Sequence, residues 1–115
     1  MLKKSIFIFL FILPLSSFAH SPITNLIPSD GAVLLIAPKE IKIEFVNPAM
    51  FTKFEMINVT ENNKKIELSK KFLMVLSDTH SIKLPKLGSG KYNTVWRAMA
   101  SDGHVIKGKF TFEVY

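Results

Sequence analysis

Residues 90–97 read GKYNTVWR and residues 109–114 read KFTFEV, and these two stretches decide the fold class. In both, large apolar side chains alternate with polar or charged ones. A period of two is typical of a β-strand with one buried face. Gly88-Ser89-Gly90 precedes the first stretch and has the composition of a turn. We therefore predict two strands whose aromatic residues, Trp96 among them, supply much of the core.

The same alternation continues toward the N-terminus in shorter segments. It occurs in residues 40–46, 65–68 and 81–85, and residues 55–60 are rich in β-formers. Prolines punctuate the first half of the chain, and no window there carries a helical period. About seven short strands with turns every ~8–12 residues predict an all-β fold, an antiparallel Greek-key β-sandwich of the immunoglobulin-like class.

The amino-acid composition and the absence of certain motifs exclude several classes of protein and of functional site. The chain has 115 residues, enough for one small domain, and its 48% hydrophobic content excludes a disordered chain. It has no cysteine, which excludes a disulfide, a zinc–thiolate site and a cysteine nucleophile. No serine-hydrolase elbow, phosphate-binding glycine loop or metalloprotease helix motif is present, so we predict that the protein is not an enzyme.

The first 19 residues have the three parts of a secretory signal peptide. Lys3 and Lys4 form a basic start, residues 6–15 are apolar, and Ser17 and Ala19 are the small residues before a cleavage site. Ten apolar residues span about 15 Å as a helix, half of a bilayer core. We therefore predict cleavage after Ala19, export to the periplasm, and a soluble, monomeric mature domain of residues 20–115.

Removal of Lys3 and Lys4 lowers the formal charge from +6 to +4. The remaining lysines are scattered, and Arg97 is the one arginine of the sequence. A nucleic-acid interface usually concentrates such charges. We therefore predict no nucleic-acid partner.

Cleavage after Ala19 would make His20 the N-terminal residue. Its free amine and its imidazole Nδ1 could then close one chelate ring on a metal ion. Two nitrogens in one plane suit a tetragonal Cu(II) ion. Pro22 has no amide proton to lose, so the metal cannot bind far along the peptide and further ligands must come from elsewhere in the fold.

Asp102 and His104 are candidates for those ligands. They flank Gly103, and on an extended segment both side chains would point the same way. Together with His20 they would form a set of one amine, two imidazoles and one carboxylate, which suits Cu(II). The alternative is an ordinary Asp-Gly turn with a polar histidine beside it.

The third histidine and the methionines have simpler interpretations. His80 precedes a predicted strand and is expected to be a surface or loop histidine. Met50, Met56, Met74 and Met99 form no close cluster, which favours gap-filling in the core over thioether ligation. Met50 is the best candidate for an exception, because it lies in a stretch that reads as a loop.

Several motifs together resemble the CopC domain of periplasmic copper-resistance proteins. At the N-terminal side these are His20, residues 28–31 (PSDG), residues 37–38 (AP) and residues 41–45 (IKIEF). At the C-terminal side they are residues 90–97 (GKYNTVWR), residues 101–104 (SDGH) and residues 108–114 (GKFTFEV). The likeness covers essentially all of residues 20–115.

The resemblance implies a Greek-key β-sandwich that binds one Cu(II) per chain through His20, Asp102 and His104. It also implies a periplasmic copper carrier that buffers or delivers copper, with a CopD-type inner-membrane transporter as a partner. Some members carry a second, Met-rich Cu(I) site with a histidine. In the comparable region this sequence has only Met50 and Met56 and no histidine, so we expect a Cu(II)-only type.

Two alternatives stay open at the level of sequence. A metal-free sandwich that serves as an interaction module would have His20 far from His104. A copper-brace monooxygenase would also use an N-terminal histidine and a second histidine, but Asp102 would then block a position that oxygen needs.

Overall fold

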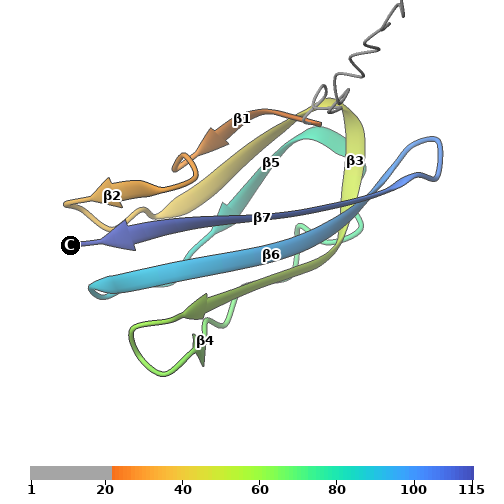
Figure 1. Cartoon of the computed structure of the whole chain (residues 1–115). Coiled ribbons are helices and arrows are strands. Elements are labelled where there is room, and N and C mark those ends of the chain that lie inside the picture. The colour runs from red at the N-terminus through yellow and green to blue at the C-terminus, as the bar shows by residue number, and fades with distance from the viewer. Residues whose placement is uncertain (1–21) are drawn as a thin grey trace, which may run out of the picture.

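The computed structural model describes residues 22–115, which form seven strands and, within that range, no helix (Figure 1). This confirms the predicted all-β class. The strands are β1 (Ile23–Ile27), β2 (Ala32–Leu34), β3 (Glu40–Asn58), β4 (Lys64–Lys65), β5 (Ser77–Lys83), β6 (Gly90–Ala100) and β7 (Val105–Val114). Among these residues no helix is long and apolar enough to cross a membrane.

Strand β3 joins the two layers of the sandwich. Its first part pairs with β1 and β5 up to Phe45, and its second part pairs with β6 from Ala49 to Asn58. Between the two parts the strand bends, and the pairing with β5 shifts in register (Figure 1). Pro48 lies in this bend. Proline cannot donate to a ladder, so a bend or bulge is where a strand tolerates it.

The remaining pairings make the connections Greek-key rather than sequential. Strands β6 and β7 form an antiparallel hairpin, and β2 lies parallel to β7 at the edge of the sheet. Strand β1 skips β2 and pairs with β3. Asp30 secures the edge, because its carboxylate accepts a hydrogen bond of 2.9 Å from the backbone N–H of Thr111.

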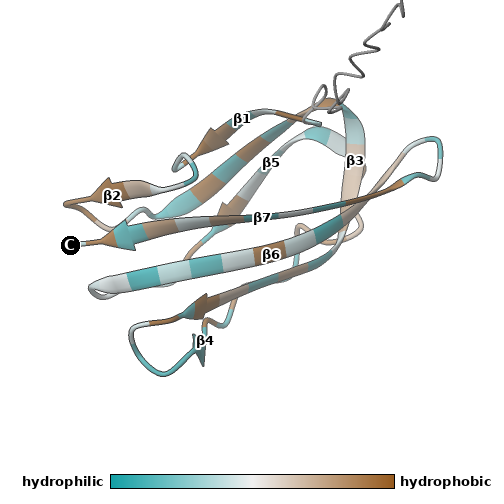
Figure 2. Ribbon diagram, in the orientation of Figure 1, coloured by the Kyte–Doolittle hydropathy of each residue, from teal (hydrophilic) through white to brown (hydrophobic). Residues whose placement is uncertain are grey.

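The core lies between the two parts of β3 and is rich in aromatic rings. Alternate residues of β3 and β6 are buried, and Figure 2 shows the resulting bands of apolar and polar residues along β3. The Trp96 ring packs at a centroid distance of 5.7 Å from Phe45 and 5.6 Å from Phe51. The predicted role of Trp96 and the phenylalanines in the core is therefore confirmed.

Some predicted strand boundaries were wrong. Residues 40–46 and 55–60 are not separate strands, because most of both belongs to the continuous β3. Strand β4 ends at Lys65, so Ile66 and Leu68 pack on the core from outside a strand. Strands β1 and β2, which are short and lie beside Pro28, were not predicted individually.

Candidate metal centre

The loop between β6 and β7 holds the predicted Asp-Gly-His motif. The backbone N–H of Ala100 donates to the His104 carbonyl at 2.8 Å, and the N–H of Gly103 donates to the Ala100 carbonyl at 2.9 Å. Gly103 has φ +91°, a conformation that side-chain-bearing residues rarely adopt. The motif is therefore a tight turn, as the alternative interpretation of Asp-Gly expected, and not the extended segment on which both side chains would point the same way.

This turn brings Asp102 and His104 into direct contact. Nδ1 of His104 lies 2.7 Å from Oδ2 of Asp102, and the His104 backbone N–H donates to Oδ1 at 3.0 Å. The bond from the backbone N–H is the main cause, and the imidazole bond the second, of an Asp102 pKa below its usual value. Both side chains are exposed, with 82% of His104 and 63% of Asp102 accessible.

The pair can present a nitrogen and an oxygen donor to solvent. When Nδ1 donates its proton to Asp102, the Nε2 lone pair of His104 is free to bind a cation, a tautomer that a neighbouring carboxylate favours at metal sites. Within residues 22–115, however, no three His, Asp or Glu side chains cluster closely enough to hold a metal ion. The pair therefore supplies two of the four donors of the predicted site.

The N-terminal end of the described chain lies at the same end of the sandwich as this turn. The Pro22 carbonyl accepts a hydrogen bond of 2.9 Å from the N–H of Val46, just before the bend of β3. At the other side of the bend, Ala49 pairs with Ala100, the first residue of the turn's hydrogen-bonded ring. Figure 1 shows the start of β1 and the β6–β7 loop at this shared end. His20, the other predicted ligand, lies outside the described residues.

His80 is not the surface or loop histidine that the sequence suggested. It lies within β5 and is 6% exposed, with its ring edge-on to Phe45 and Phe51. Its Nε2 lies 2.9 Å from the Ala49 carbonyl and 2.8 Å from the Ser77 carbonyl. The signal for burial was present in the sequence, since His80 shares its strand face with Ile82. This histidine ties β5 to the bend of β3 and is not a ligand at the turn.

The four methionines of the described residues differ in burial. Met56 is fully buried, as gap-filling predicted, whereas Met74 is exposed and does not fit that prediction. Met50 lies in β3 rather than in a loop, and it pairs with Met99 across the sheet. Both are half-buried on the outer face.

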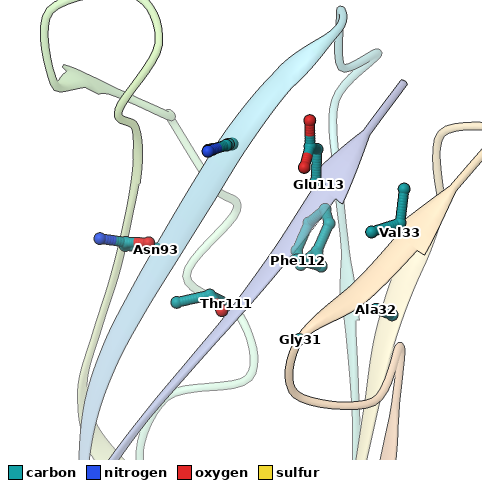
Figure 3. Close-up of a pocket in the computed structure, with 8 residues that line it drawn as sticks. Gly31, Ala32, Val33, Asn93, Thr111, Phe112 and Glu113 are labelled. Atoms are coloured by element: carbon teal, nitrogen blue, oxygen red, sulfur yellow. The ribbon is translucent and has the colours of Figure 1, made fainter.

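One shallow depression lies far from the turn. It has a volume of about 270 Å³ and lies where β2 adjoins the hairpin, between Val33, Asn93 and Thr111 (Figure 3). Phe112 and Glu113 also line it, near the end of β7 that is remote from Asp102. It carries no group of metal-binding side chains.

Comparison with known proteins shows where the chain belongs. It is 32% identical to the copper transport protein CutJ of Bacillus subtilis over 93% of its own length, although it spans only 20% of that relative. It is 28% identical to the protein YobA of Escherichia coli, with 86% of this chain and 82% of YobA aligned. The fold matches the crystal structure of CopC from Methylosinus trichosporium with a TM-score of 0.66 and 23% identity, covering 83% and 93% of the two chains. A sequence profile of the CopC domain matches residues 23–115, and the chain therefore belongs to the CopC-domain family.

Proposed function

We propose that this protein is an exported, non-enzymatic carrier that binds one Cu(II) ion through the amine and imidazole of His20, the carboxylate of Asp102 and the imidazole of His104. In this proposal residues 1–19 are a signal peptide removed after Ala19, and the domain of residues 20–115 works in the periplasm. It buffers copper or delivers it to a CopD-type membrane partner.

The observation that carries the proposal is that Pro22 and the Asp102–His104 turn lie at the same end of the sandwich. A chain advances at most about 3.6 Å per residue, so a site that includes His20 must form within roughly 7 Å of Pro22 plus the reach of the His20 side chain. The path past the bend of β3, from the Val46 partner of Pro22 to the Ala49–Ala100 pair, is short, which supports a site that combines the N-terminal amine with the turn. A metal-free module predicts that His20 is far from His104, and the position of Pro22 at the end that carries the turn supports the metal site instead.

The chemistry of the donors supports Cu(II). The exposed pair offers one imidazole nitrogen and one carboxylate oxygen, and the chelating N-terminus would add two nitrogens. The Asp102 pKa is lowered, so its carboxylate is ionised and available across the whole neutral range. A carboxylate in this position also disfavours the copper-brace oxygenase, which needs an equatorial position open for oxygen. The relative named as a copper transport protein supports copper as the cargo.

The test is a Cu(II) titration of the exported protein, followed by electron paramagnetic resonance, after mass spectrometry has identified its first residue. We expect one tight equivalent with a tetragonal, nitrogen-rich signal. The signal should be lost in His104→Ala and weakened sharply when an alanine is inserted before His20. Asp78→Asn is the matched control, because exposed Asp78 has the same spacing to His80 as Asp102 has to His104. Equal Cu(II) affinity with and without the inserted alanine would refute the site.

A further inference from the structure

Three cations lie in a row across the outer face of the sheet. Lys53 of β3 is directly opposite Arg97 of β6, and Arg97 is directly opposite Lys107 of β7. Directly opposite residues of antiparallel strands point to the same face, with Cβ atoms about 4.5–5.5 Å apart. All three side chains are exposed. We call these three residues the cationic row.

The cationic row has no internal counter-charge. Across residues 22–115 none of its members forms an ion pair, the two pairs in that range being Lys42–Glu40 and His104–Asp102. Lys109, two residues further along the same face of β7, adds a fourth cation, against one carboxylate at Glu55. Like charges directly opposite one another destabilise a sheet. The sheet therefore carries an electrostatic cost that an external anion would relieve.

An apolar row lies between the cationic row and the Asp102–His104 turn. Met50, Met99 and Val105 are opposite one another on the same outer face, one step closer to the turn. Val105 is 55% exposed, and the two methionines are half-buried. Flexible thioethers adapt to varied surfaces, and an apolar strip with a polar border, rich in Met and Arg, is typical of a protein interface.

From these rows we propose that this face docks a protein partner whose surface carries carboxylates beside an apolar strip. The partner would sit on the cationic row with its acidic groups and on Met99 and Val105 with its apolar groups. It would then lie against the turn that holds Asp102 and His104. That the partner exchanges copper there rests on the proposed function, whereas the docking itself does not.

A protein partner fits this face of the sheet better than an anionic membrane does. A peripheral membrane contact combines basic residues with exposed aliphatic ones that enter the lipid. The most exposed aliphatic residues, Leu35 and Ile36, follow β2 at the opposite end of the sheet, where Leu34 pairs with Val114. From Lys107 to Val114 the strand runs seven residues, roughly 23 Å at 3.3 Å each. Leu35 and Ile36 therefore do not form one surface with the cationic row, whose apolar neighbours towards the turn are Val105 and two half-buried methionines.

The test uses the copper-free domain and a synthetic peptide that repeats Glu-Glu-Leu, titrated by NMR. We expect backbone amide shifts centred on residues 53, 97, 99, 105 and 107, and affinity that falls as salt screens the charges. Replacement of Lys53, Arg97 and Lys107 by Gln should weaken binding about tenfold, since exposed ion pairs contribute modestly each. The control replaces exposed Lys65, Lys70 and Lys71 by Gln, which changes the net charge equally, and should cost no more than about twofold.

Equal weakening in both triple variants, or shifts centred elsewhere, would overturn the proposal. Binding to phosphatidylglycerol vesicles through the same row, without peptide binding, would replace it with a membrane contact. A Cu(II) titration of the Lys53, Arg97 and Lys107 variant should give wild-type affinity. If wild-type protein failed to bind Cu(II), the proposed function would fall while the peptide titration still decided the docking surface.

Discussion

The indole of Trp96 lies directly against the backbone of Gly108 on the next strand. A Cβ atom built at Gly108 would lie 2.2–2.7 Å from atoms of the indole, closer than atoms can approach. We expect Gly108→Ala to push the indole out of the core and lower the free energy of unfolding by about 1–3 kcal/mol, the usual cost of overpacking. Urea denaturation measures the change.

Gly88→Ala is the matched control for that substitution. Gly88 has open space around its Cβ position, so alanine there should change stability by less than ~0.5 kcal/mol. Equal stability of the two variants would mean that the indole moves at no cost. The glycine at the start of residues 108–114 (GKFTFEV) is thus explained by its packing against Trp96.

His80 gives a second prediction at the scale of the residue. Its substitution tests whether this buried histidine stabilises the fold without binding copper. His80→Ala removes a buried ring and leaves the carbonyls of Ala49 and Ser77 without their partner. We expect a loss of about 2–4 kcal/mol, from the cavity and the unsatisfied groups together. In the fraction that stays folded, the Cu(II) stoichiometry should not change. A lost copper equivalent in folded protein would show that His80 contributes to the site.

At the scale of the strands, the cationic row predicts a stabilising substitution. Lys107→Glu on β7 would place a carboxylate directly opposite Arg97 and replace repulsion by attraction. We expect a gain of about 0.2–1 kcal/mol in the free energy of unfolding. Lys109→Glu is the control, because Lys109 lies opposite uncharged Val95. A gain of the same size in the control would assign the effect to net charge instead of to the pairing.

Strand β3 shows how far sequence alone could predict these elements. Its alternation at residues 41–45 was readable, because each buried side chain is followed by an exposed one. Pro48 and the loop-like stretch after it predict a break, although the strand continues through Pro48 as a bend. Continuation depends on the pairing of Ala49 with Ala100, a long-range contact that no local pattern carries. Strand β2 was missed for the same reason, since three residues beside β7 have no period of their own.

At the scale of the whole molecule, the sequence alone could predict the residues of the candidate site but not their arrangement. The motif predicted that Asp102 and His104 point the same way on an extended segment, whereas the structure joins them in a turn with Nδ1 of His104 2.7 Å from Oδ2 of Asp102. The sequence could not show that Pro22 enters at the same end, since that follows from how β1 pairs with β3. Nor could it place Lys53 opposite Arg97, because register is set by the turns and the bulge near Phe51.

Stability of the whole fold should also fall in alkali because of Tyr92. Its ring stacks on Phe112 at 5.3 Å and its hydroxyl donates to the Gly88 carbonyl at 2.7 Å, near the loop that precedes β6. Burial, followed by the charge of Glu61, raises the pKa of Tyr92 above its ordinary value of 10.0. The folded state thus favours the neutral phenol, so its contribution to stability is complete below about pH 10 and disappears as the pH rises through the higher folded-state pKa.

We expect urea midpoints to decline above about pH 10 in the wild type and less steeply in Tyr92→Phe, which has no proton to lose. The phenylalanine variant should start about 1 kcal/mol lower at neutral pH, since it lacks the bond to Gly88. Tyr115→Phe is the matched control, because Tyr115 is 78% exposed and should leave the pH profile unchanged. If both variants followed the wild-type curve, Tyr92 would not govern alkaline unfolding. The hydroxyl of Tyr92 would then contribute to the fold only through its hydrogen bond.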